Sequence, residues 1–251
     1  MEPIVNTLVA RAEALQSVIE QNRASGSAQS RAVIALAGPP GSGKSTIAKM
    51  VVDRLNVGRP VPAALVLPMD GFHYSRAVLN AMPNADEAHA RRGAAWTFDA
   101  DGLVALLRCL KESGQRPLPE IHDIVAPSFD HSIKDPVADD IVIGRHITMV
   151  IVEGLWLLYD EEPWRQIRDL VDESWYIDVD SDAARERIAR RHISSGIETS
   201  WDAALARADG NDILNGIAVR EKLLSPDIKV FSVDDIVVGT PTAEHAPAEI
   251  S

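Results

Sequence analysis

Residues 38–45 read Gly38-Pro39-Pro40-Gly41-Ser42-Gly43-Lys44-Ser45 and match the pattern G-x-x-x-x-G-K-[ST] at every fixed position. The neighbouring sequence agrees with this motif, because the apolar run 32–37 is typical of a buried strand and the residues from Thr46 onward are typical of a helix. In such a strand–loop–helix unit, backbone N–H groups surround a phosphate group and the helix N-terminus adds a partial positive charge. The stretch therefore predicts a phosphate-binding loop.

This loop predicts how a nucleoside triphosphate and a metal ion are held. Lys44 is expected to reach the terminal phosphates, and the Ser45 hydroxyl is expected to ligate Mg²⁺. GTPases, ATP-driven motors and small-molecule kinases share such a loop, so the reaction has to be inferred from other residues. The sequence does not contain the N-K-x-D signature of guanine-specific GTPases. The residues predicted to bind the nucleotide are Gly38, Gly41, Ser42, Gly43, Lys44, Ser45 and Thr46.

The composition limits the class of protein. The 251 residues are 46% hydrophobic and 25% charged, which is an ordinary globular balance and enough chain for one large α/β domain. The formal net charge of −12 argues against a general nucleic-acid partner. No apolar run reaches the roughly 18 residues of a membrane span, and the N-terminus lacks the layout of a secretion signal. With Cys109 as the single cysteine, we expect a soluble cytoplasmic protein without membrane contact.

Short apolar runs alternate with helical patterns along the chain. The expected strands are 32–37, 63–67, 149–152, 175–179 and 229–233. The expected helices are 4–22, 47–55, 103–110 and 184–193. Strands that alternate with helices predict a parallel sheet built from βαβ units. We therefore expect an α/β protein with a three-layer P-loop NTPase fold: a mainly parallel central sheet, flanking helices and a helical lid.

One domain over residues 31–239 accounts for these strands, with the lid around 185–200. Residues 1–30 are expected to form an amphipathic N-terminal helix and a linker of small residues. Residues 240–251 are rich in proline and alanine, and we expect them to be disordered.

Two of the expected strands end in an acid. Asp70 follows the run Leu65–Met69, and Glu153 follows the run Met149–Val152. The ligand crevice of a parallel sheet lies at the carboxyl ends of its strands, so both carboxylates are expected beside the phosphate loop. Carboxylates next to a triphosphate suit a Mg²⁺ ligand and a base, and a single strand-end acid would more often end a turn.

These residues resemble the family of P-loop kinases that includes uridine kinase, phosphoribulokinase and pantothenate kinase. The resemblance covers roughly residues 30–235 and rests on the segments 38–46, 69–72, 127–131 and 152–155. Segments 70–73 and 96–99 look most like the branch labelled fructose-transport-system kinases. Asp70-Gly71-Phe72-His73 stands where uridine kinases carry an Asp-Ser-Phe-Tyr-like segment, which argues against a nucleoside acceptor.

The resemblance implies roles for particular residues. It implies that Asp70 is the base that takes the proton of the acceptor hydroxyl and that His131 lies near the acceptor. It also implies that Arg187 and Arg191, on the lid helix, meet the charge of the transferring phosphoryl group. For Glu153 we expect a role at the metal.

Other residues near these segments are candidates for the acceptor site. We expect Gly71 to allow a sharp turn and leave room for a substrate, and Phe72 to wall the acceptor pocket. His73 fits either a wall of this pocket or a surface loop. Arg92, in the pair Arg91-Arg92, fits either an anionic acceptor or a solvated loop. The residues Arg207, Asn211 and Asn215 recur at helical spacing; they fit a polar helix face, with a substrate contact through Asn211 as the alternative.

The function expected from these features is an ATP- and Mg²⁺-dependent kinase that phosphorylates a hydroxyl of a small metabolite, such as a sugar, a nucleoside or a pantothenate-like acceptor. The alternative is an NTP-hydrolysing switch or accessory protein that acts on a protein partner. The partners expected for the first are a nucleoside triphosphate and the acceptor. The sequence leaves the acceptor, the choice between ATP and GTP, and a homo-oligomeric state open.

Overall fold

A computed structural model describes residues 1–27, 29–116 and 120–232 of the chain. The expected disordered tail 240–251, the end of the predicted domain and the last residue of the expected strand 229–233 lie outside the described residues. The strands are β1 (Ala32–Ala37), β2 (Ala64–Pro68), β3 (Ile124–Asp130), β4 (Asp135–Ile143), β5 (Met149–Gly154), β6 (Glu173–Val179) and β7 (Ile228–Ser232). The α-helices are α1 (Glu2–Ser25), α2 (Lys44–Leu55), α3 (Arg76–Asn80), α4 (Ala85–Ala90), α5 (Ala100–Gly114), α6 (Ile167–Leu170), α7 (Ser181–Ser194), α8 (Trp201–Arg207) and α9 (Ile213–Glu221).

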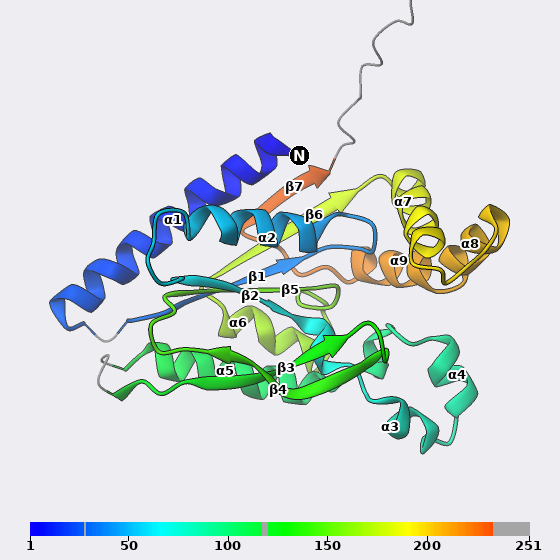
Figure 1. Ribbon diagram of the computed structural model, residues 1–251, viewed down its shortest axis with the longest axis horizontal. Helices are drawn as coiled ribbons and strands as arrows, with labels where there is room; N and C mark the ends of the chain where they lie inside the picture. Colours follow the sequence, from blue (N-terminus) through cyan, green and yellow to red (C-terminus); the bar gives the residue numbers. More distant parts are fainter. Residues whose placement is uncertain (28, 117–119, 233–251) are drawn as a thin grey trace, which may run out of the picture.

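In the described part of the chain, parallel strands form a central sheet in the order β2-β5-β1-β6-β7. Helices α1 and α2 cover one face of this sheet, and α5 and α6 cover the other (Figure 1). This arrangement confirms the predicted α/β fold with a parallel sheet between two helical layers. No helix within the described ranges is both long and apolar enough to cross a membrane.

The apolar character of the strands follows from burial on both faces. In β1, Val33 and Ala35 belong to the core cluster on the α5 side, whereas Ile34 and Leu36 belong to the cluster on the α1 and α2 side. A strand whose side chains alternate between two buried layers needs apolar residues at every position. This is why the strand could be recognised from a continuous run.

Helix α1 extends beyond the expected helix 4–22 at both ends. Gly26 ends it in the left-handed conformation, with φ of 73°. Leu8 is fully buried in the cluster shared with α2 and the sheet, and Arg11 Nε donates to Glu173 of β6 at 2.8 Å. The N-terminal helix is therefore packed into the central core.

The antiparallel pair β3–β4 was not expected from the sequence. Strand β4 carries Asp135, Asp139 and Asp140, which break its apolar residues into short groups, and most of its side chains are half-buried or exposed. Its register with β3 shifts between Ala126 and Ser128, which interrupts the alternation that identifies a strand.

Candidate functional site

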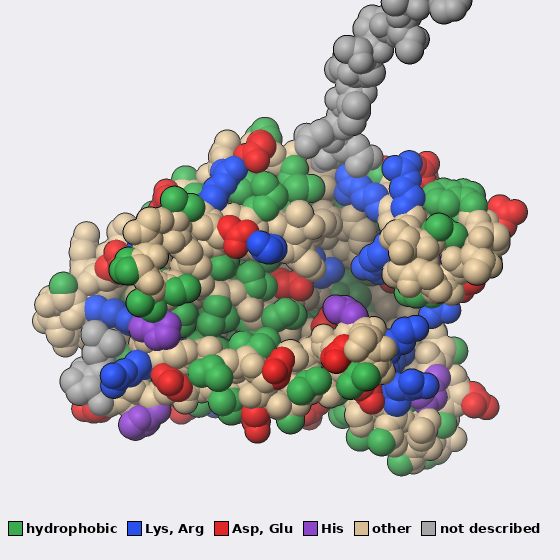
Figure 2. All heavy atoms as spheres, viewed as in Figure 1, with side chains coloured by type: hydrophobic (Ala, Val, Ile, Leu, Met, Phe, Trp, Pro, Cys, Tyr) green, Lys and Arg blue, Asp and Glu red, His purple; other side chains and the backbone are tan. Residues whose placement is uncertain are grey.

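Three neighbouring strands end in the residues predicted to carry the chemistry. The phosphate loop follows β1, Glu153 lies near the end of β5, and Asp70 follows β2. Strand β5 lies between the other two, and Glu153 pairs with Leu36 on one side and Pro68 on the other. Parallel strands end at one edge of a sheet, so the three groups converge there, as predicted. Figure 2 shows the surface hollowed at this end, between the α7–α9 region and the region of α3 and α4.

Close packing explains the glycines of the phosphate loop. Gly41 has φ of 79°, and a Cβ at this position would lie 2.8 Å from the carbonyl oxygen of Ala184 in α7. A Cβ at Gly38 would lie 2.5 Å from the carbonyl oxygen of Ile177 in β6. The Ser42 hydroxyl is buried without a hydrogen-bond partner among the described residues, so a bound phosphate oxygen would satisfy it.

Glu153 is buried against the first turn of α2. Only 6% of its surface is exposed, and the Ser45 hydroxyl lies 3.1 Å from each of its carboxylate oxygens. Burial raises the pKa of Glu153, and the charge of Asp70 adds to this rise, whereas the charge of Lys44 and the Ser45 hydrogen bond lower it. The four groups therefore lie within electrostatic reach of one another.

This arrangement fits a magnesium ion. Ser45 and Glu153 offer the hard oxygen ligands that Mg²⁺ prefers. Within the described residues, no group of three or more His, Cys, Asp or Glu side chains forms a metal cage. A cage is not required, because Mg²⁺ in kinase sites is commonly held by one or two protein oxygens, substrate phosphates and waters.

Asp70 lies in a short 3₁₀ turn, η1 (Met69–Phe72), and its side chain is 48% exposed. Two glycines allow this turn to pack closely. A Cβ at Gly154 would lie 2.5 Å from the Cβ of Met69, and a Cβ at Gly71 would lie 2.2 Å from the carbonyl oxygen of Pro127. The chain does turn at Gly71, but the prediction that this glycine leaves room for a substrate is wrong. Glycine is needed there because β3 passes directly against the turn.

His73 lies beside Asp70 and between two aromatic rings. Its ring centroid is 3.9 Å from that of Phe98 and 5.0 Å from that of Phe129. Its Nδ1 is 2.9 Å from the carbonyl oxygen of Asp70, which can only accept a hydrogen bond, so Nδ1 carries the proton. Burial lowers the pKa of His73, against the opposing effect of the Asp70 charge. The structure thus places a neutral imidazole next to Asp70.

Phe72 and His131 differ in how they relate to the predicted acceptor pocket. Phe72 is 6% exposed and belongs to the core cluster on the α5 side, so it packs mainly against the core, and its role as a wall of the acceptor pocket stays a prediction. His131 follows β3 and is exposed, and its ring centroid is 5.3 Å from that of Phe129. His131 therefore lies on the same aromatic row as His73.

Arg92 is occupied by partners within the chain. Its guanidinium donates to the carbonyl oxygens of Lys134 and Tyr74 and to the Asp135 carboxylate, at 2.5, 3.0 and 2.7 Å. Its side chain is 16% exposed. The interpretation as a solvated loop is therefore wrong, and Arg92 joins the β3–β4 turn to the segment after His73. A contact of Arg92 with an anionic acceptor stays a prediction.

The arginines of α7 do not share one environment. Arg187 Nη1 donates to the carbonyl oxygen of Gly41 in the phosphate loop at 3.0 Å. Arg191 lies 3.5 Å from the carboxylate of Asp212, and the side chain of Arg190 is 71% exposed. The structure thus brings Arg187 to the phosphate loop and holds Arg191 against the helix that follows.

The predicted polar stripe of Arg207, Asn211 and Asn215 is interrupted by a π-helix, η5 (Ala208–Asp212). Asn215 is 4% exposed and accepts a hydrogen bond from Arg91 Nη2 at 3.1 Å. Asn211 Nδ2 donates to the carbonyl oxygen of Arg92 at 2.9 Å. The interpretation as a solvated polar face is therefore wrong for Asn215, and Asn211 has an intramolecular partner.

Two acids that organise the site were not expected from the sequence. Asp135 holds Arg92, and it also accepts a hydrogen bond from the Arg76 N–H at 2.8 Å. Asp212 lies 3.5 Å from both Arg191 and His192. An isolated acid in a hairpin or a helix has no sequence signature, so only the spatial arrangement identifies these two.

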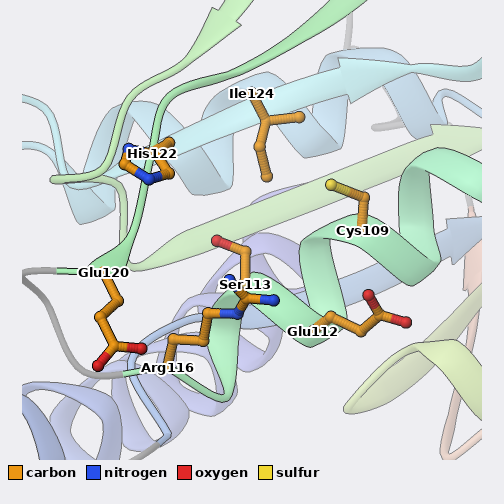
Figure 3. Close-up of a pocket in the computed structure, with 7 residues that line it drawn as sticks. All are labelled: Cys109, Glu112, Ser113, Arg116, Glu120, His122 and Ile124. Atoms are coloured by element: carbon orange, nitrogen blue, oxygen red, sulfur yellow. The ribbon is translucent and has the colours of Figure 1, made fainter.

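A separate cavity of about 150 Å³ is lined by residues of α5 and of the segment 120–124 (Figure 3). Cys109, Ser113, His122 and Ile124 are among its lining residues. Its α5 wall ends at Gly114, which packs against Arg31 at the amino end of β1. The cavity is therefore remote from the phosphate loop.

Comparisons with known proteins agree with this geometry. The model of the family described as "Phosphoribulokinase / Uridine kinase family" matches residues 33–200. A Schizosaccharomyces pombe protein named "Putative uridine kinase C227.14" is 40% identical over 200 residues, which cover 80% of this chain and 83% of that protein. The "ATP-dependent kinase YFH7" of Zygosaccharomyces rouxii is 35% identical over 64% of this chain, which spans about half (49%) of that protein.

Among solved structures, the "putative fructose transport system kinase" from Silicibacter sp. TM1040 superimposes with a TM-score of 0.68 and 31% identity. The match covers 80% of this chain and 89% of that one. The family match, the phosphate loop and the converging strand ends lead to one conclusion. The chain belongs to the phosphoribulokinase/uridine kinase family and is a P-loop kinase that uses ATP and acts on a small molecule with a hydroxyl acceptor.

Proposed function

We propose that this kinase transfers the γ-phosphoryl group of ATP to a hydroxyl of a small metabolite in a Mg²⁺-dependent reaction, with Asp70 as the base. The observation that carries this proposal is the difference between two neighbouring carboxylates. Glu153 is buried and bonded to Ser45, whereas Asp70 is 48% exposed on the next strand end. The first environment supports a role at the metal, and the second supports contact with an acceptor.

In this mechanism, the acceptor oxygen forms a bond to the γ-phosphorus while the bond from phosphorus to the β,γ-bridging oxygen breaks and ADP leaves. Asp70 orients the hydroxyl and accepts its proton. Lys44 lies at the terminal phosphates and balances their charge. Ser45 and Glu153 would hold Mg²⁺, which supplies charge neutralisation on the phosphate oxygens.

In this proposal, the part of the site that binds the acceptor is formed around His73. Because Nδ1–H donates to the backbone at Asp70, Nε2 keeps a lone pair that can accept a hydrogen bond from the acceptor. The lowered pKa keeps this imidazole neutral near pH 7. His131 supplies a second imidazole on the exposed end of the aromatic row. A sugar or another polyhydroxyl metabolite suits these groups.

Arg187 and Arg191 supply positive charge from α7. Arg187 already contacts the phosphate loop at Gly41, whereas Arg191 lies 3.5 Å from Asp212 and would leave it when α7 closes over the nucleotide. Arginine suits this task, because its planar guanidinium binds several phosphate oxygens at once. Closure would also exclude water, which competes with the acceptor for the phosphoryl group.

The test is an ATP-dependent phosphorylation screen of a metabolite library, with Asp70→Asn and Lys44→Ala run in parallel. Asp70→Asn should bind ATP normally and keep its melting temperature, while acceptor phosphorylation falls on the order of 10²–10⁴-fold. Lys44→Ala should lose turnover altogether. A phosphorylation rate within a few-fold of wild type in Asp70→Asn would show that Asp70 only ends its strand. ATP turnover that responds to a protein partner and to no metabolite would favour the switch instead.

A further inference from the structure

The loop that carries Arg91, Arg92 and Gly93 is held from the α8–α9 side by two asparagines. Asn211 Nδ2 donates to the carbonyl oxygen of Arg92 at 2.9 Å, and Asn215 Oδ1 accepts from Arg91 Nη2 at 3.1 Å. Gly93 has φ of 108°, and a Cβ there would lie 3.7 and 3.8 Å from the two asparagine amides. Both amides therefore lie directly against this loop.

The same loop is also bonded to the segment that begins at Asp70, on the proposed acceptor side of the site. Arg92 donates to the carbonyl oxygen of Tyr74, which directly follows His73, and to Asp135 in the β3–β4 hairpin. The Tyr74 N–H in turn donates to the carbonyl oxygen of Thr97 at 3.0 Å. Arg92 thus has its backbone fixed by Asn211 and its guanidinium fixed to the segment that begins at Asp70.

Asp212, which directly follows Asn211, contacts helix α7. Asp212 lies 3.5 Å from Arg191 and 3.5 Å from His192, and the His192 side chain is only 5% exposed. These contacts lie at the end of the π-helix η5, and π turns occur frequently at functional sites. A phosphate group that draws Arg191 away from Asp212 would change the contacts of the helical turn that holds Arg92.

We propose that Asn211 and Arg92 are positioning residues that transmit nucleotide binding from α7 to the Asp70 loop. This proposal rests on the proposed function, since it assumes that α7 responds to the phosphates. The chain of contacts runs from Arg191 to Asp212, through the backbone to Asn211, and through Arg92 to Tyr74. Its consequence is that nucleotide and acceptor bind with positive coupling, because the ligands favour the same arrangement of one connected element.

Amide hydrogen exchange on the full chain tests this, with a non-hydrolysable ATP analogue and Mg²⁺ as the probe. In wild type, exchange should slow at 38–46 and also at 70–76 and 91–98, by about fivefold or more if the coupling has a typical strength. Asn211→Ala should keep the slowing at 38–46 and lose it at 70–76. Arg207→Ala is the matched control, since this residue starts the same stripe but contacts Glu198 and is 56% exposed. It should behave like wild type.

The outcomes separate this proposal from the proposed function. No change at 38–46 in wild type would contradict nucleotide binding at the loop. A change at 38–46 with none at 70–76, or one at 70–76 that survives in Asn211→Ala, would overturn the coupling. If Asn211→Ala fails to fold, Arg92→Lys gives the same test, because lysine keeps the charge but cannot make the three contacts of the guanidinium. Retained slowing at 70–76 in Arg92→Lys would overturn the proposal equally.

Discussion

At the scale of single residues, environment assigns different tasks to similar side chains. Asp70 and Glu153 are both strand-end acids, but only Glu153 is buried and bonded to a helix hydroxyl. His73 and His131 lie on one aromatic row, but only His73 is enclosed by rings on both sides. Such differences can be tested by substitutions that change one property at a time.

Glu153→Gln should weaken the dependence on Mg²⁺ more than the binding of nucleotide. We expect the Mg²⁺ concentration for half-maximal ATP turnover to rise on the order of 10–100-fold, the range seen when support of a metal site is lost. The melting temperature should not fall, since the amide replaces a carboxylate whose pKa is raised by burial. Mg²⁺ titration of turnover and a nucleotide-binding assay check both points. An unchanged half-saturation and rate would contradict a role at the metal.

His73→Phe should reduce the loss of stability on acidification. The folded pKa of His73 lies below its unfolded value of about 6.5, because burial disfavours the charged form. The unfolded chain therefore binds more protons than the folded chain below pH 6.5, and stability falls as pH drops through this window. Phenylalanine has no titrating group, so it removes this pH dependence, and its ring keeps the packing against Phe98 and Phe129. Melting curves between pH 7.5 and 5 should show a smaller drop for His73→Phe than for wild type. Exposed His131→Phe serves as the comparison, and an equal drop in all three proteins would rule the idea out.

At the scale of secondary structure elements, the site depends on how closely β3 approaches the turn that carries Asp70. Gly71→Ala would place a Cβ 2.2 Å from the carbonyl oxygen of Pro127, so the turn or the strand must move. We expect a loss of roughly 1–3 kcal/mol in stability, typical of overpacking. Displacement of Asp70 by about 1 Å should also lower acceptor phosphorylation on the order of 100-fold.

The matched control is Gly210→Ala in the π-helix, where an added Cβ would meet nothing within 4 Å. Alanine should be tolerated there. It should stabilise the protein by up to about 1 kcal/mol, because alanine has a higher helix propensity than glycine. Denaturant unfolding and phosphorylation rates compare the two variants. Equal behaviour of Gly71→Ala and Gly210→Ala would mean that the contact with β3 does not position Asp70.

The elements also show what sequence alone could predict. Strands β1 and β5 are buried on both faces, so continuous apolar runs located them and the acid at the end of β5. The phosphate loop was recognisable because its backbone geometry demands particular residues at fixed spacing. Strand β4 and the π-helix were not predictable, since Asp135, Asp139 and Asp140 interrupt the apolar residues of β4 and no residue pattern marks the π-helix η5. The misassigned residues, Arg92 and Asn215, bind partners more than 40 residues away, and no local pattern reports such contacts.

At the scale of the whole molecule, the site lies at one edge of a sheet that is covered on both faces. Helix α1 packs on α2, and α2 begins at Lys44 in the phosphate loop. The phosphate loop is therefore connected through α2 to the packing of the N-terminal helix α1. If this helix belongs to the cooperative core, a cavity within α1 should destabilise the entire protein together with the site.

Leu8→Ala tests this cooperativity. Leu8 is fully buried in the cluster that includes Ile34 and Ile47, so its truncation leaves a cavity under the sheet. We expect a cost of roughly 2–5 kcal/mol, which corresponds to a fall in melting temperature of roughly 4–20 °C for a domain of this size. Val18→Ala, on the same helix but 49% exposed, should change stability by less than about 0.5 kcal/mol. A single unfolding transition in Leu8→Ala, with nucleotide binding lost at the same temperature as the fold, would support one cooperative unit. Two transitions, or an unchanged main transition with early proteolytic release of α1, would show instead that the helix is an appendage to an independently stable kinase core.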